Sequence, residues 1–217
     1  MGVRRGWGGV ITALAAVFGV VGLVSPASAA AGPSAEQLFA AADRVVHLRA
    51  SAADRALLAS VPEVADKVVD PARTKVEFDR GQPAKAALAG GAGTAAKTGV
   101  GAQASEYNWA YVKVTYYSTT GFQVYTWRQY VEWYYDYVVV TGWKNRLDFI
   151  DYNDGTANFS PGFYTNYADR PGGRSAVSVM QKAVQHCWIQ YGCWGWSYPR
   201  TQINTFYNGT ATWSSFV

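Results

Sequence analysis

Apolar and polar side chains alternate along two stretches in the second half of the chain. Over residues 110–117, Ala, Val and Tyr occupy the even positions and Tyr, Lys and Thr the odd ones. Over residues 125–139, Tyr, Trp and Val dominate the odd positions. A period of two, rich in aromatic and β-branched residues, predicts strands with one buried face.

The second stretch also allows a helix. Val124, Trp127, Val131 and Val138 fit helical spacing. The aromatic content favours the strand, and its length exceeds that of an ordinary strand. We therefore predict a bend or a β-bulge inside it.

Turn signals divide the rest of this region into further short strands. Asn-Asp-Gly at 153–155 and Asn-Gly at 208–209 are typical of hairpins. The predicted elements are a turn at 142–146, strands at 147–152 and 156–160, a strand-like segment at 175–187, and a final hairpin of 201–207 with 210–216. About seven or eight strands in residues 106–217 predict a mainly β domain, an antiparallel β-sandwich or barrel.

Residues 30–81 have a different pattern and are predicted to be helical. Ser34 with Gln37 forms a capping box ahead of apolar residues at helical spacing. Ser51 suits the cap of a second helix, and Pro62 the first turn of a third. Residues 82–105 are mostly Ala, Gly, Thr, Lys and Gln, which predicts a flexible linker. The helical segment is a pro-segment, a spacer or a docked module, with the spacer favoured.

Residues 1–29 are predicted to be a signal peptide. Arg4 and Arg5 precede an apolar run over residues 10–24, and Ala27-Ser28-Ala29 provides small residues for cleavage. The run is shorter than the roughly 20 residues that a membrane-spanning helix needs. The leader is similar to the alanine-rich leaders of high-GC Gram-positive bacteria. We therefore expect a secreted, extracellular bacterial protein with no membrane attachment after cleavage.

The net charge and the distribution of basic residues limit the classes of binding partner that we expect. The formal net charge is +4, and removal of Arg4 and Arg5 with the leader halves it. The remaining Lys and Arg are scattered, whereas nucleic-acid-binding proteins gather them on one face, so nucleic acid is not an expected partner. Cys187 and Cys193 are the only cysteines, and in an oxidising compartment they are expected to form a disulfide.

Patterns that carry catalytic chemistry are scarce, and we predict no catalytic residue, metal site or cofactor. No serine has a nucleophile-elbow pattern around it, and His186 is the only histidine in the aromatic region. Asp148, Asp151 and Asp154 leave open an extracellular hydrolase acting on glycosides or cell wall. A protein-interaction or inhibitor module presenting the Cys187–Cys193 loop is a further alternative.

The stronger signal is a surplus of aromatic side chains. All 15 tyrosines and all but one of the 9 tryptophans follow residue 106. One strand face absorbs about half of these rings, and the rest suit stacking against sugars or a protein partner. The candidate binding residues are Tyr111, Tyr117, Tyr130, Tyr134, Trp188, Trp194, Trp196 and Tyr198. The favoured hypothesis is a non-enzymatic binding module for a carbohydrate, a cell-wall polymer or an extracellular protein.

Overall fold

The computed structural model describes residues 32–83, 105–188 and 190–216. The chain divides into a unit Met1–Gly32 and a compact unit Pro33–Val217, and the fold is that of the second unit. The predicted signal peptide and most of the predicted linker lie outside the described residues.

The helices come first in the described chain. They are α1 (Ala35–Val46), α2 (Ala52–Ala59), α3 (Pro62–Ala65) and the 3-10 turn η1 (Pro71–Arg73). The predicted capping box of Ser34 and Gln37 is confirmed, and Ser51 forms a second one with Asp54. Pro62 begins α3 as predicted, since the first helical position needs no N–H donor.

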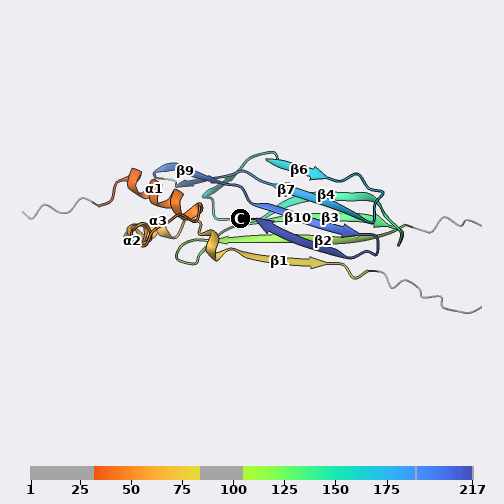
Figure 1. Ribbon diagram of the computed structural model, residues 1–217. Helices are drawn as coiled ribbons and strands as arrows, with labels where there is room; N and C mark the ends of the chain where they lie inside the picture. The colour runs from red at the N-terminus through yellow and green to blue at the C-terminus, as the bar shows by residue number, and fades with distance from the viewer. Residues whose placement is uncertain (1–31, 84–104, 189, 217) are drawn as a thin grey trace, which may run out of the picture. The chain divides into compact units, whose positions relative to one another are not determined.

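The strands form antiparallel sheets (Figure 1). Sheet A has the order β1-β2-β3-β4 and comprises β1 (Lys75–Arg80), β2 (Glu106–Tyr117), β3 (Gln123–Tyr135) and β4 (Val140–Asn153). Sheet B has the order β11-β10-β7-β6 and comprises β6 (Thr165–Ala168), β7 (Ser175–Gln181), β10 (Arg200–Phe206) and β11 (Ala211–Phe216). Sheet C has the order β5-β8-β9 and comprises β5 (Ala157–Phe159), β8 (Val184–Trp188) and β9 (Gly192–Ser197).

Sheets A and B pack against each other as a β-sandwich, which confirms the predicted mainly β, antiparallel fold. Contacts run from β10 to β2 and β3, from β4 to β7 and from β1 to β11. The predicted seven or eight strands become β1 to β11 for three reasons. Strand β1 lies in the segment predicted to be helical, β6 and β9 were not predicted, and the predicted segment 175–187 divides into β7 and β8. The strand prediction for residues 125–139 is confirmed up to Tyr135, where β3 ends, and the pairing of β3 has the expected register shifts. Residues 136–139 instead form the connection from β3 to β4.

The structure confirms one of the predicted turns as a hairpin and contradicts another. The final hairpin is confirmed, with Asn208 and Gly209 between β10 and β11. The turn predicted at residues 142–146 is wrong, because these residues lie inside β4. The chain reverses earlier, next to Tyr137, which has a positive φ of 67°. Asn153–Gly155 makes a turn but no hairpin, because β5 pairs with β8 rather than with β4.

The helical segment contributes to the core of the same unit. Leu38, Ala41, Ala42 and Val45 on α1 are at most 1% exposed and belong to one cluster with the buried strand residues. Helix α1 packs against β9 of sheet C. The end of this segment, Lys75–Arg80, was predicted to be helical and is instead strand β1, the edge of sheet A next to β2.

A buried polar contact ties the two sheets of the sandwich together. Gln129 on β3 is fully buried; its amide nitrogen donates to the Ser178 hydroxyl at 2.9 Å, and Thr201 donates to its amide oxygen at 2.6 Å. Buried polar groups with complete hydrogen bonding specify one arrangement of the elements they connect. The sandwich therefore presents the outer face of sheet A in a fixed register.

Candidate functional site

The outer face of sheet A carries the largest group of partly exposed aromatic rings found among the described residues. In β2, Asn108, Ala110 and Val112 point into the sandwich, so the residues between them point outward. In β3 the even-numbered residues from Arg128 to Tyr134 point outward in the same way, whereas Val124 and Thr126 are buried. We call this surface the aromatic face, formed by Tyr107, Trp109, Tyr111, Tyr130, Tyr134 and Phe149.

Several rings of the aromatic face are nearly parallel. The Trp109 and Tyr111 rings have centroids 6.1 Å apart with an interplanar angle of 8°. The rings of Trp109 and Tyr130, on neighbouring strands, are 6.4 Å apart at 19°. Tyr134 and Phe149 extend the group through edge contacts with Tyr107 and Tyr130 respectively. Tyr107 is 55% exposed and Phe149 39%, and the other rings are half-buried by one another.

Cations lie over the rings, and each is paired with a carboxylate. The Arg128 guanidinium lies 4.7 Å from the Phe149 ring centroid and binds Asp151 at 2.8 Å. The Lys144 ammonium lies 3.8 Å from the Tyr107 ring centroid, and 3.6 Å from a carboxylate oxygen of Glu132. Such contacts hold the rings in place because the ring face attracts positive charge.

Glu132 supplies an ionised polar edge to the aromatic face. Burial opposes its ionisation, but hydrogen bonds from Asn145 and Tyr130, with the charge of Lys144, outweigh burial and lower the pKa of Glu132. Burial and the hydrogen bond to Glu132 raise the pKa of Tyr130 to about 12. At neutral pH the face therefore presents a carboxylate acceptor next to a protonated phenol.

Of the four tyrosines named from the two alternating stretches, three lie within the aromatic face and one lies farther along β2. Tyr111, Tyr130 and Tyr134 belong to the face. Tyr117 is half-buried near the end of β2, with the Lys75 ammonium 5.1 Å from its ring centroid. Tyr107, Trp109 and Phe149 were not among the sequence candidates. The alternation of β2 extends to Trp109 and Tyr107, which lie two and four residues before Tyr111, so the same pattern followed back from Tyr111 locates them.

The four aromatic residues named around the disulfide divide into a buried pair and an exposed pair. Trp188 and Trp194 are 5% and 9% exposed and pack against each other, and the ring of Phe39 on α1 packs on Trp188. They therefore contribute to the core. Trp196 and Tyr198 are 39% and 44% exposed.

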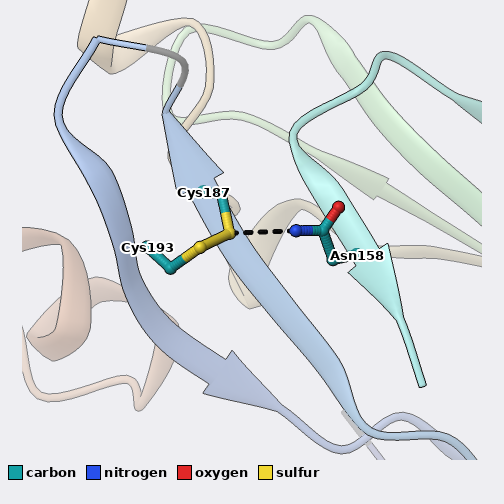
Figure 2. The surroundings of a disulfide bond; sticks show 3 residues. All are labelled: Asn158, Cys187 and Cys193. Atoms are coloured by element: carbon teal, nitrogen blue, oxygen red, sulfur yellow. Dashed lines mark hydrogen bonds between the residues drawn. A yellow bond between two sulfur atoms is a disulfide. The ribbon is translucent and has the colours of Figure 1, made fainter.

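The expected disulfide between Cys187 and Cys193 is present and joins β8 to β9 (Figure 2). The Asn158 amide donates to the Cys187 sulfur at 3.2 Å, which connects the bridge to β5. The loop that it closes is a short hairpin connection in sheet C.

The carboxylates of the alternative hydrolase hypothesis are engaged in structural contacts. Asp148 binds the buried Lys182 at 3.0 Å and accepts from the Trp127 indole at 3.1 Å. Asp151 binds Arg128, and Asp154 binds Lys67 at 2.9 Å. Within the described ranges, no group of three His, Cys, Asp or Glu side chains is arranged to hold a metal ion.

The fold and this surface define a disulfide-containing antiparallel β-sandwich with an aromatic outer face. Comparison of the chain with protein-family models, with curated proteins and with solved structures gave no match. Among the residues that the structure describes, no helix has the length and apolar character to cross a membrane.

Proposed function

We propose that this chain is a secreted, non-enzymatic binding protein that holds an extended neutral polysaccharide against the aromatic face. The observation that carries the proposal is the set of nearly parallel rings of Trp109, Tyr111 and Tyr130 on an outward sheet surface. Rings of this kind stack against the apolar face of a sugar, and their phenol and indole edges hydrogen-bond its hydroxyl groups.

The charge pattern of the aromatic face supports a neutral polymer. Its outward basic side chains are matched by an equal number of acidic ones: Lys75, Lys113, Arg128 and Lys144 against Glu77, Asp79, Glu132 and Asp151. An anionic polymer would have to displace the carboxylates from Lys113, Arg128 and Lys144. A neutral polymer meets an already balanced surface and keeps these ion pairs.

The aromatic face is part of a contiguous apolar area on the outer surface of sheet A. Contiguous apolar patches on soluble proteins mark places where other molecules bind. The side chain of Leu147, 45% exposed and opposite Tyr130, extends this apolar area onto β4. The area is a sheet surface rather than a cavity, which suits a polymer lying along it.

The test is retention of the full chain on insoluble neutral polysaccharides such as cellulose and chitin. We expect retention, and we expect the Trp109→Ala/Tyr111→Ala double variant to lose about tenfold or more in affinity, equivalent to about 1.4 kcal/mol. Phe122→Ala is the matched control, because Phe122 is 61% exposed and lies outside the aromatic face.

Salt provides an independent readout. Binding to a neutral polymer should change little between low and high ionic strength, because screening acts on charge interactions. The proposal fails if the chain is retained only by anionic polymers in a salt-sensitive manner. It fails equally if the double variant is retained as well as Phe122→Ala.

A further inference from the structure

A small cavity lies where the end of α1 meets the end of β9. The exposed side chains of Trp196 and Tyr198 line it. Its volume is about 280 Å³, just below the roughly 300–1,000 Å³ of typical small-molecule pockets. Leu48, just after α1, contributes a third exposed apolar side chain. Tyr116 lines the cavity from the inward side of β2, so this cavity is distinct from the outward aromatic face.

The cavity combines an apolar rim with uncharged polar groups. Ser197 and His47 are among its lining residues, and no Asp, Glu, Lys or Arg is present among the described residues that form it. The lining side chains therefore offer no Asp, Glu, Lys or Arg to a charged ligand, and the nearby Asp43 carboxylate is paired with His47 at 3.2 Å and Arg49 at 3.3 Å. A neutral ring with hydroxyl groups matches both the rim and the polar groups.

Contacts behind the cavity hold its polar groups in place. The Ser197 hydroxyl lies 2.9 Å from Nε2 of His186 and 3.2 Å from the Tyr125 hydroxyl. The Nδ1 atom of His47 lies 2.8 Å from the carbonyl oxygen of Asp43. In the neutral form, His47 thus carries its proton on Nδ1, which leaves Nε2 as a hydrogen-bond acceptor.

The backbone of Leu48 provides a second, independent observation. Leu48 has a φ of 56°, and it directly follows His47, the C-cap of α1. Glycine is the usual residue at this position because a side chain is disfavoured in the left-handed region. Leu48 is 61% exposed, so core packing does not explain why leucine is tolerated there. Backbone strain of this kind gathers at binding sites, where a particular side chain is needed.

We propose that this cavity is a second binding site, which takes a single neutral sugar ring. The ring stacks on Trp196 and Tyr198 and contacts Leu48, and its hydroxyl groups hydrogen-bond to Ser197 and His47. Its size favours one ring, as at the end of a glycan chain, whereas the aromatic face favours an extended polymer. The two sites act on different sides of β2, so each can be tested without the other.

The test follows the indole N–H signals of the full chain by NMR during titration with methyl glycosides of glucose, galactose, mannose and N-acetylglucosamine. The Trp196 signal is assigned by its loss in Trp196→Phe. We expect a saturable shift of this signal with at least one glycoside, and at least tenfold weaker binding in Trp196→Ala. Trp213→Ala is the matched control, since Trp213 is 38% exposed and does not line the cavity.

Leu48→Gly separates a binding role from a structural one. Relief of the left-handed strain should raise the thermal midpoint by about 2–4 °C. Affinity for the glycoside should fall several-fold in the same variant, which a purely structural residue would not cause.

The outcomes also separate this proposal from the proposed function. The Trp109→Ala/Tyr111→Ala variant should lose polymer retention and keep the Trp196 shift. The cavity proposal is overturned if no glycoside moves the Trp196 signal, if Trp213→Ala weakens the binding as much as Trp196→Ala, or if Leu48→Gly binds with unchanged affinity.

Discussion

His186 shows at the residue scale how burial sets a chemical state. It is 1% exposed, its ring stacks on Trp194 with centroids 5.1 Å apart, and burial lowers its pKa to about 4. The charge of Asp154 acts in the opposite direction, and His47 acts in the same direction as burial. His186 is therefore neutral at pH 7 and serves as a hydrogen-bond partner of Ser197.

Because His186 is buried in its neutral form, the stability of the folded chain should depend on pH. The folded pKa of His186 lies below the unfolded value of about 6.5, so the unfolded chain binds the extra proton first as the pH falls. The free energy of unfolding should decline between about pH 6.5 and pH 4, by up to about 3 kcal/mol from this group. NMR of the histidine C–H signals measures it directly, because the chain has only His47 and His186. A His186 signal that titrates near pH 6.5 would contradict the prediction.

Alternation in the sequence was sufficient to place individual tyrosines on the outer side of sheet A. Tyr111 and Tyr130 stand directly opposite each other there, as the parity of their strands requires. The exposure of each ring was beyond sequence reasoning, because it depends on which neighbouring rings cover it. Phe149 is an example, since it joins the face only through its pairing with Arg128 across a strand with register shifts.

At the element scale, local signals located turns better than they located partners. Asn208-Gly209 specified its hairpin because both strands lie next to the turn in the sequence. Asn153–Gly155 bends the chain, but β5 finds its partner β8 about thirty residues away through packing that no local pattern encodes. Gly142 suggested a turn; instead, a Cβ at that position would lie 3.7 Å from the ring of Tyr134. That distance is an ordinary van der Waals contact, so Gly142 lies within a regular strand and marks no turn.

Helix α1 provides a prediction at this scale. Leu38 is 1% exposed and shares a core cluster with strand residues, so Leu38→Ala should cost about 2–4 kcal/mol of unfolding free energy. Leu147→Ala, at a residue 45% exposed, should cost less than about 1 kcal/mol. Urea unfolding followed by tryptophan fluorescence is the measurement, since it reports on the strand region. An unchanged midpoint in Leu38→Ala would mean that α1 does not stabilise the sandwich.

At the scale of the whole molecule, the alanine-rich helical segment and the aromatic β region belong to one compact unit, although their compositions differ. The alanine-rich helices have small side chains and could bury little area on their own. Their burial comes from the aromatic half, where Phe39 packs against Trp188 and α1 lies on β9. Composition alone predicted a helical segment separate from the aromatic β domain. It describes the side chains of each segment, but not which other segment packs against them.

The same contacts predict that residues 105–217 do not fold by themselves. Without residues 32–83, β2 loses its pairing with β1, and the carbonyl oxygen of Ala211 loses its 2.7 Å hydrogen bond from Arg80. An uncovered edge strand also invites aggregation.

We expect the isolated fragment 105–217 to lack cooperative unfolding. When it is co-expressed with a tagged 32–83 fragment, the two should purify together and unfold cooperatively, because their contacts in the intact chain are non-covalent. A soluble 105–217 fragment that unfolds cooperatively at the midpoint of the full chain would show that the sandwich is complete without β1 and α1. The assembly of this fold therefore depends on contacts between residues on either side of the segment 84–104, whose sequence is the least distinctive in the chain.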